Sequence, residues 1–299
     1  MALQTSGAIS LNDIHVEAGG SSGTQASIND SDIRGLINKA SGAQMSFSEW
    51  YGASSETVLT SAGNVNGQAQ RKQISASSFI SSGGTLRIPS NIWVWSDSTS
   101  TAALTIDISC TIINEGKIIG RGGNGNGGSG GPAIKINSGV SGVTIQNASG
   151  AFIGGGGGGG SDGGGPALGG GGGAGGGTGG SSNAGGGGAG GSLNAAGSTG
   201  SSTGSGTGGA GGNQGGQGGA RSNSNGAASG GGGGRVAFGS SSTGGAAINE
   251  NGGDGGGWGA SGGSTTYYGG PQGGSGGAAI NDSGNSYTLS NSGTIYGAT

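Results

Sequence analysis

Residues 154–180 read GGGGGGGSDGGGPALGGGGGAGGGTGG, and this composition decides the fold of the chain. Of the 87 glycines in the chain, 71 lie within residues 121–280, where they make up close to half of the positions. Glycine has no side chain to bury, and it loses more backbone freedom on folding than any other residue. An ordinary apolar core therefore cannot form here. The segment is either disordered or folded in an architecture that requires glycine.

Charge and proline content favour the folded alternative. Residues 121–299 contain four basic and four acidic side chains, whereas disordered segments usually carry high net charge or many Pro, Glu, Gln and Lys residues. Collagen is excluded because there is no strict Gly-X-Y register and the chain has only four prolines. A polyproline II helix made of glycine, called polyglycine II, has three residues per turn and leaves its N–H and C=O groups free for neighbouring helices. We predict a bundle of short polyglycine II helices over residues 121–280, with a flexible linker as the alternative.

Three other segments share a strand-turn-strand pattern. Each begins with β-branched or apolar residues, passes through a turn that contains asparagine, and ends in a second short strand closed by glycine. The segments are 111–120 (TIINEGKIIG), 144–154 (TIQNASGAFIG) and 288–297 (TLSNSGTIYG). We expect residues 281–299 to form a closing β-hairpin that pairs with or stacks on the earlier copies, as in a β-solenoid. Residues 53–120 are predicted to be a linker and β-strand region, in which Trp93 and Trp95 are core residues.

Residues 1–52 are predicted to be a separate, small α+β module. A Ser-apolar-polar-acid pattern occurs three times in it and is typical of a strand that runs into a helix N-terminus. Its apolar positions, which we expect to be buried, are Leu11, Ile28 and Phe47. A last short turn contains Trp50 and Tyr51 and is capped by Gly52. With this module, a solenoid-like or sandwich-like middle and a glycine bundle, the expected fold is mostly β and irregular with little α-helix.

The module also carries a family resemblance. The runs GAISLNDI at 7–14, SINDSDIRGL at 27–36 and MSFSEWYG at 45–52 resemble the N-terminal module of tail-fibre and tail-tip proteins of tailed bacteriophages. A glycine-rich body is similar to the distal adhesins of T-even-type phages, where polyglycine II helices display loops that contact the host receptor. The resemblance implies attachment to other phage tail or baseplate proteins, with Leu11, Ile28, Phe47, Trp50 and Tyr51 as attachment candidates. It also implies recognition of a host polysaccharide or outer-membrane protein.

The sequence offers little for catalysis. His15 is the only histidine, so neither a histidine-based triad nor a multi-histidine metal site can form. Matches to G-x-G-x-x-G arise by chance in so much glycine, and none is followed by the Gly-Lys-Ser/Thr of a phosphate loop. Glu250 and Asp254 are the nearest pair of carboxylates in the body, and we interpret them as solvated turn residues. We predict no enzyme, no cofactor and no metal site.

Compartment and partners follow from what the sequence lacks. No signal peptide and no membrane-spanning run are recognisable, and the single Cys110 is read as a small buried residue. These features fit a virion protein assembled in the host cytoplasm and not secreted. A net charge of −3 argues against nucleic acid as a partner, and homo-oligomerisation stays open.

Recognition is expected in the inserts that dilute the glycine. These are residues 192–208, 213–229, 235–251 and 258–272. The last insert contains Trp258, Tyr267 and Tyr268, which we predict to be the receptor anchors, because aromatic side chains dominate binding hot spots. Arg235 and Phe238 form a second candidate patch. The same aromatics could instead cover the end of the glycine bundle, and the chain could be a structural fibre spacer, a baseplate protein or an unrelated antifreeze-type or coat protein.

Overall fold

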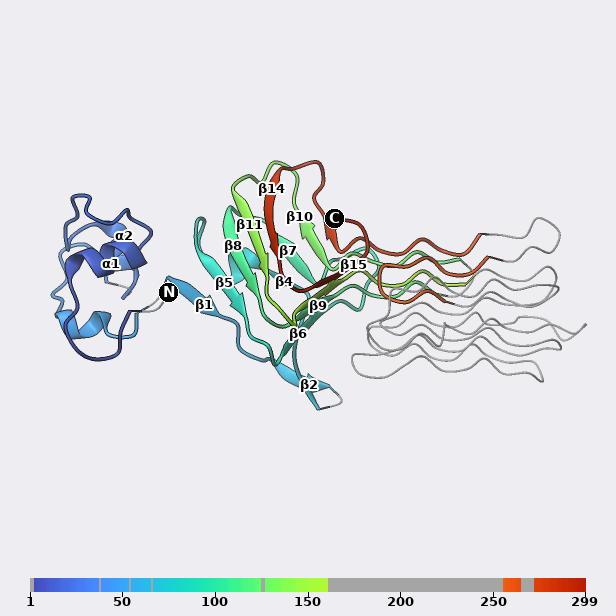
Figure 1. Ribbon diagram of the computed structural model, residues 1–299, viewed down its shortest axis with the longest axis horizontal. Coiled ribbons are helices and arrows are strands. Elements are labelled where there is room, and N and C mark those ends of the chain that lie inside the picture. Colours follow the sequence, from blue (N-terminus) through green and yellow to red (C-terminus); the bar gives the residue numbers. More distant parts are fainter. Residues whose placement is uncertain are drawn as a thin grey trace, which may run out of the picture.

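The structure is a computed structural model with three parts. They are a small N-terminal module, a β-solenoid, and extended glycine segments that leave the solenoid on the side away from the module and return to it (Figure 1). The described residues are 3–37, 39–53, 55–65, 67–124, 127–160, 255–264 and 272–299.

Three short helices build the module around a small apolar core. They are α1 (Leu11–Glu17), α2 (Ser31–Gly35) and the 3₁₀ helix η1 (Phe47–Trp50). Ile14, Ile33 and Trp50 are fully buried, and the indole N–H of Trp50 donates a hydrogen bond of 3.2 Å to the carbonyl of Ile33. Helices and extended loops, with no strand, make up the described residues of the module, so the strands expected there are only extended residues that precede helices.

The repeated Ser-apolar-polar-acid pattern forms the same hydrogen bond three times. In each copy the acid side chain accepts from the backbone N–H of the serine, which satisfies a donor at the start of a turn. The pairs are Ser10 with Asp13 at 2.9 Å, Ser27 with Asp30 at 2.7 Å, and Ser46 with Glu49 at 2.8 Å. The apolar residue that follows the serine is not the buried one. In the first and third copies the residue four positions after the serine is buried instead, Ile14 in the first and Trp50 in the third. Phe47, directly after the serine of the third copy, is therefore 46% exposed.

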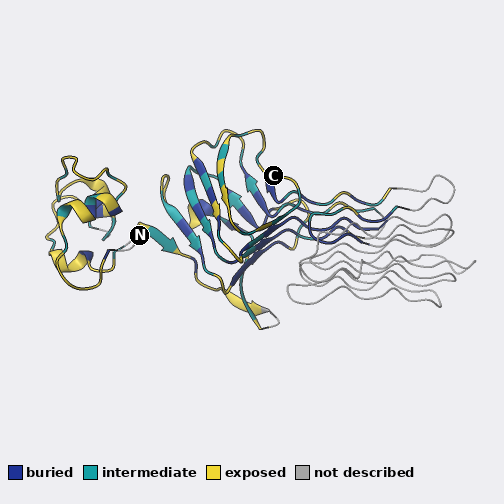
Figure 2. Cartoon of the chain, viewed as in Figure 1, coloured by how far each residue is buried: buried dark blue, intermediate teal, exposed yellow. Residues whose placement is uncertain are grey.

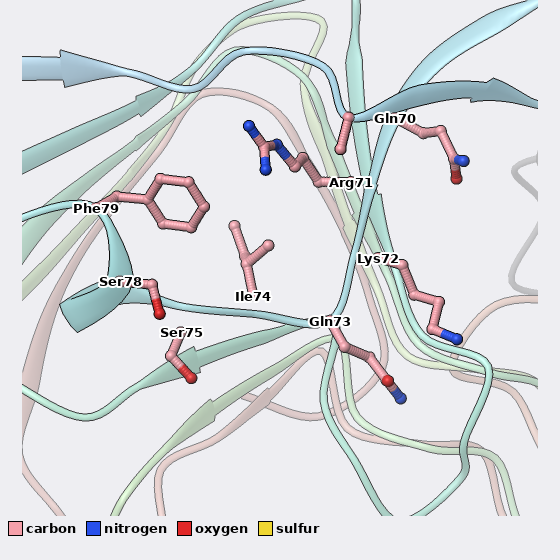
Figure 3. A pocket seen from close by; sticks show the side chains of 9 residues that line it. Gln70, Arg71, Lys72, Gln73, Ile74, Ser75, Ser78 and Phe79 are labelled. Carbon is pink, nitrogen blue, oxygen red and sulfur yellow. The ribbon is translucent and has the colours of Figure 1, made fainter.

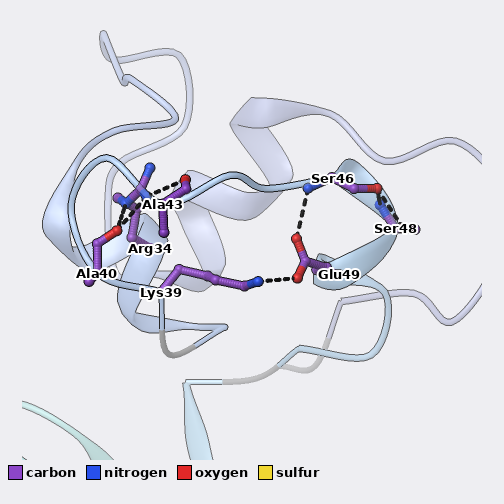
Figure 4. Close-up of polar contacts among 7 residues, drawn as sticks. All are labelled: Arg34, Lys39, Ala40, Ala43, Ser46, Ser48 and Glu49. Carbon is purple, nitrogen blue, oxygen red and sulfur yellow. Dashed lines mark hydrogen bonds and ion pairs between the residues drawn. The ribbon is translucent and has the colours of Figure 1, made fainter.

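Buried and paired charges hold the loop between α2 and η1 (Figure 4). The guanidinium of Arg34 is 2% exposed and donates to the carbonyls of Ala40 and Ala43. Lys39 pairs with Glu49 at 2.6 Å. These contacts leave both basic groups of the module engaged.

The middle of the chain is a three-sided solenoid of parallel strands. The first sheet contains β1 (Glu56–Val58), β5 (Thr85–Ile88), β8 (Cys110–Asn114), β11 (Val143–Asn147) and β14 (Tyr287–Asn291). The second contains β2 (Gly63–Val65), β3 (Gln68–Lys72), β6 (Ile92–Trp95), β9 (Lys117–Ile119), β12 (Phe152–Gly154) and β15 (Thr294–Tyr296). The third contains β4 (Ile74–Ser75), β7 (Leu104–Ile106), β10 (Ile134–Ile136) and β13 (Ile280–Asn281), with the 3₁₀ helix η2 (Ala76–Ser78) after β4.

The coils run through the sheets in the order first, second, third; the first coil adds an antiparallel β2–β3 pair to the second sheet, and the last coil ends at β15. Equivalent residues of successive coils are therefore stacked, as Ile112 of β8, Ile145 of β11 and Leu289 of β14 are in the first sheet. The inward-facing side chains form one continuous buried core, seen as dark bands along the strands (Figure 2). This arrangement confirms that the chain is mostly β and irregular with little helix.

The three repeated strand-turn-strand segments are equivalent corners of successive coils. An asparagine occupies each corner, and the three form a ladder: Asn114 donates to Asn147, and Asn147 donates to Asn291, both at 2.8 Å. The closing β-hairpin that we predicted is wrong. β14 and β15 belong to different sheets and pair in parallel with β11 and β12, because in a solenoid the hydrogen-bond partners lie one coil away.

The glycine segments are long connections between the second sheet and the third, at one corner of the solenoid. In the first two coils this connection is short, Gln73 and then residues 96–103. In the third and fourth coils it is glycine-rich and longer, residues 120–133 and 155–279. Connections at one corner of stacked coils leave the solenoid side by side. The solenoid thus brings distant glycine-rich stretches into one body.

Candidate functional site

One glycine segment, residues 154–160, lies at the centre of the described body and accepts hydrogen bonds from three neighbouring segments. Along it the acceptors for any one neighbour are three residues apart. Carbonyls 154, 157 and 160 accept from Gly120, Gly123 and Gly127, carbonyls 156 and 159 from Gly277 and Gly274, and carbonyls 155 and 158 from Gly259 and Gly256, all at 2.7–2.9 Å. A β-strand would bond two neighbours with a period of two. A threefold period suits the three residues per turn of polyproline II.

These contacts leave no space for a side chain. A Cβ atom placed on Gly156 would lie 1.8 Å from the carbonyl oxygen of Arg121, and one on Gly158 would lie 1.8 Å from that of Gly274. One on Gly130 would lie 1.9 Å from the oxygen of Gly156. The obstructing atoms are backbone atoms, which cannot rotate away as a side chain does. Glycine is therefore required at these positions for the segments to approach.

Trp258 lies where the body meets the solenoid and is fully buried. Its ring packs edge-on against Phe152 at 5.8 Å and Tyr296 at 5.3 Å between centroids, and its buried cluster also includes Ile119. Trp258 is therefore not available as a receptor anchor, which corrects the prediction for this residue. It covers the end of the glycine segments instead, because the solenoid supplies the apolar neighbours that the glycine sequence itself lacks.

The same face of the second sheet carries further aromatic side chains. Trp93 and Trp95 are 3% and 5% exposed, which confirms their core role. Lys117 lies between Trp93 and Phe152, with its ammonium 4.8 Å and 5.4 Å from the two ring centroids. Burial lowers the pKa of Lys117 from its ordinary value. The aromatic faces offset part of this cost by attracting the cation.

The other recognition candidates, Tyr267, Tyr268, Arg235 and Phe238, lie outside the described residues, as do Glu250 and Asp254. The structure describes the residues on both sides of 265–271. Ser264 Oγ donates to Gln272 Oε1 at 3.0 Å and accepts from the N–H of Gly273 at 3.1 Å. Gly262 donates to the carbonyl of Gly274 at 2.8 Å. The two ends of this aromatic stretch are thus held together.

The attachment candidates divide into buried and exposed residues. Trp50 is fully buried and holds the module together, so it does not contact a partner directly. Leu11 and Ile28 are half-buried, and both pack against the module core. Phe47 and Tyr51 are 46% and 38% exposed and lie on its surface.

A pocket of about 420 Å³ lies at the first coil, between β3, β4 and η2 (Figure 3). Arg71 lies over the ring of Phe79 at 5.3 Å, and its Nε donates to the carbonyl of Thr60 at 2.6 Å. Gln73 donates to Ser96 Oγ at 2.9 Å. Polar groups of the pocket thus bond other parts of the chain, and they hold the first coil in place.

Groups suited to chemistry are sparse in this structure. Among the described residues, no three His, Cys, Asp or Glu side chains lie close enough together to hold a metal ion. Cys110 is buried, and burial raises the pKa of its thiol to about 11, so it stays protonated and unreactive near neutral pH. No helix within the described ranges has the length and apolar character needed to span a membrane.

Comparison with known protein families gives a match to a phage protein family. The model of the family described as phage tail fibre adhesin Gp38 matches residues 53–231, which include most of the solenoid and much of the glycine-rich region. The module at residues 1–52 lies outside the match. Searches of curated proteins and of solved structures gave no match.

Proposed function

Because the chain belongs to the phage tail fibre adhesin Gp38 family, we propose that it joins a phage tail to the host surface, with residues 1–52 on the tail side and loops of the glycine body on the host side. The family match over residues 53–231 carries this proposal. An adhesin of this family is a virion component that attaches to tail proteins and to host surface receptors.

The glycine body is proposed to be a bundle of polyglycine II helices that serves as a rigid frame. The threefold period of the hydrogen bonds along residues 154–160 supports this, and so do the glycines that admit no Cβ. A frame made of backbone bonds needs no side-chain core. Loops on a rigid frame can vary in sequence while their positions stay fixed.

Host recognition is proposed for the stretch 265–271, with Tyr267 and Tyr268 as the anchors and with Arg235 and Phe238 as a second patch. The hydrogen bonds that join Ser264 to Gln272 and Gly273 support a closed loop at this position. Closing the ends of a loop lowers the entropy that it loses on binding. Tyrosine suits either proposed receptor class, a polysaccharide or an outer-membrane protein, because it offers a large ring and a polar tip.

A purely structural fibre spacer or baseplate protein is the alternative function. The burial of Trp258 favours it to a limited extent, because one predicted anchor serves packing instead. The two proposals differ in one property: a spacer has no affinity of its own for the host cell.

Binding of the purified, fluorescently labelled full chain to host cells tests the proposal. We expect saturable binding, and we expect the double variant Tyr267→Ala, Tyr268→Ala to bind at least about thirtyfold more weakly at an unchanged melting temperature. The double variant Tyr267→Phe, Tyr268→Phe is the control, since it keeps both rings. Absence of wild-type binding would favour the spacer. Equal binding by the alanine variant would remove the two tyrosines from the receptor site.

A further inference from the structure

A groove of about 490 Å³ crosses the surface of the N-terminal module. One wall is a face of α1 formed by Asn12, Asp13, Val16 and Glu17. Leu3, Gln4, Ile9 and Ser22 also line the groove. The groove thus presents the apolar side chains of Val16 and Ile9 and the exposed carboxylate of Asp13, whereas Leu3 is buried and Glu17 is buried and accepts hydrogen bonds from Ser55.

Exposure of apolar side chains is concentrated around this module. The described residues include four large hydrophobic side chains that are strongly exposed: Val16 at 45%, Phe47 at 46%, Tyr51 at 38% and Val58 at 52%. Three of the four belong to the module, and Val16 lies in the groove. A module of about fifty residues needs most of its apolar side chains for its core, because small domains bury only a small fraction of their surface on folding. Val16, exposed beside the half-buried Ile9, indicates a surface that a partner covers.

The charge of the chain is also concentrated in the module. Residues 1–52 contain five acidic and two basic side chains, which account for the whole net charge of −3, whereas residues 53–299 are balanced. Both basic groups are engaged inside the module, Arg34 by backbone carbonyls and Lys39 by Glu49. Asp13, at the groove, is exposed. It accepts hydrogen bonds from Ser10, and no basic side chain among the described residues pairs with it. The groove therefore presents negative charge to a partner.

We propose that this groove holds a segment of another tail protein that carries both apolar and Lys or Arg side chains. The apolar side chains would cover Val16 and Ile9, and the cation would face the exposed carboxylate of Asp13. The proposal rests on the attachment role proposed above for residues 1–52. It also accounts for the position of the module outside the matched family region, because a partner-specific docking unit can differ while the adhesin region is shared.

Three substitutions of exposed apolar residues by lysine in the full chain test the proposal. Val16→Lys places a cation in the groove, Phe47→Lys alters another face of the module, and Val58→Lys alters an exposed valine on β1, outside the module. All three sites are exposed, so each variant is expected to fold, which a melting curve checks. Each protein is mixed with tail particles assembled without this chain, and the bound fraction is measured at low and at raised salt.

We expect Val16→Lys to weaken binding at least about tenfold and the other two variants to bind within about twofold of the wild type, because like charges placed against one another oppose association. Raised salt should weaken wild-type binding, since it screens exposed charge pairs. A loss confined to Phe47→Lys would move the contact to another face of the module, and so would overturn the groove but keep the attachment role. A loss confined to Val58→Lys would overturn both.

Three further outcomes would also reject the groove. Wild-type binding by Val16→Lys would show that the partner does not enter it. Binding that is independent of salt would contradict the proposal that the partner segment carries Lys or Arg side chains. A wild-type dimer that dissociates in Val16→Lys would identify the occupant as a second copy of this chain.

Discussion

Gly156→Ala tests the backbone packing of the glycine body at its tightest point. The added Cβ would lie 1.8 Å from the carbonyl oxygen of Arg121, and the two segments must separate by about 1.6 Å to reach the 3.4 Å of an ordinary contact. The N–H of Gly156 donates to Gly131 at 2.9 Å, and its carbonyl accepts from Gly277 at 2.7 Å, so the separation strains both bonds. The shift therefore disturbs three neighbours at once.

The expected cost combines two terms. Overpacking costs about 1–3 kcal/mol, and the loss of one or two hydrogen bonds adds about 1 kcal/mol each. We expect a loss of about 2–5 kcal/mol, which corresponds to a fall in Tm of about 10 °C for a unit of this size. Calorimetry of the full chain measures it.

Gly63→Ala is the matched control for this substitution. Gly63 lies on the exposed strand β2, where a Cβ would meet its nearest atom, Gln70 Nε2, at an ordinary 3.5 Å. We expect a change within about 0.5 kcal/mol. A Tm for Gly156→Ala within 1 °C of the wild type would refute close packing of the glycine segments.

Three further predictions concern the junction, the ladder and the module. Trp258→Ala should cost about 3–5 kcal/mol in a denaturant titration, because it empties a buried aromatic cluster; a stability unchanged from the wild type would contradict that packing. Asn147→Ala should cost about 1–3 kcal/mol and Asn291→Ala less, because Asn147 bonds a coil on each side whereas Asn291 is at the exposed end of the ladder; equal melting temperatures would argue against the ladder. The hydrogen bond from Lys39, followed by that from Ser46, lowers the pKa of Glu49 in the folded chain. Ionised Glu49 therefore stabilises the folded chain fully above its unfolded-state pKa, and this stabilisation is lost as pH falls through its lower folded-state pKa. Glu49→Gln should make the melting temperature fall less steeply with decreasing pH in a series of melting curves.

The coils of the solenoid could be predicted in part from sequence because their corners repeat. An asparagine at the same place in three strand-turn-strand segments predicts stacking, and the ladder of Asn114, Asn147 and Asn291 confirms it. The hairpin expected for residues 281–299 was wrong because a hairpin joins consecutive strands in an antiparallel pair. Here the sheets are parallel, so β14 and β15 each pair with a strand of the preceding coil. In the third sheet, β4 and β7 lie in the predicted linker and β-strand region, whereas β10 and β13 were missed. The strands of this sheet are two or three residues long, and the signal shared by β7, β10 and β13 is an alanine before the strand, at Ala103, Ala133 and Ala279.

The glycine body could be predicted in kind but not in its contacts. Composition alone indicates an architecture that requires glycine, whereas the pairing of residues 154–160 with three segments depends on the solenoid corner from which they leave. Trp258 illustrates the same limit. In the sequence it stands among glycines with no apolar neighbour, but its packing partners, Phe152 and Tyr296, are distant in the chain. When a side chain is buried by segments that are distant in the chain, the sequence around it contains no pattern that predicts its burial.

Hydrogen exchange across the full chain, read by mass spectrometry, tests most directly the claim that backbone bonds replace a side-chain core in the glycine body. We predict that peptides from residues 120–124, 127–131, 155–160, 256–262 and 273–277 exchange as slowly as peptides from β8 and β11 at the amides that donate hydrogen bonds between segments. Exchange of the glycine peptides at random-coil rates, beside a protected solenoid, would contradict this account.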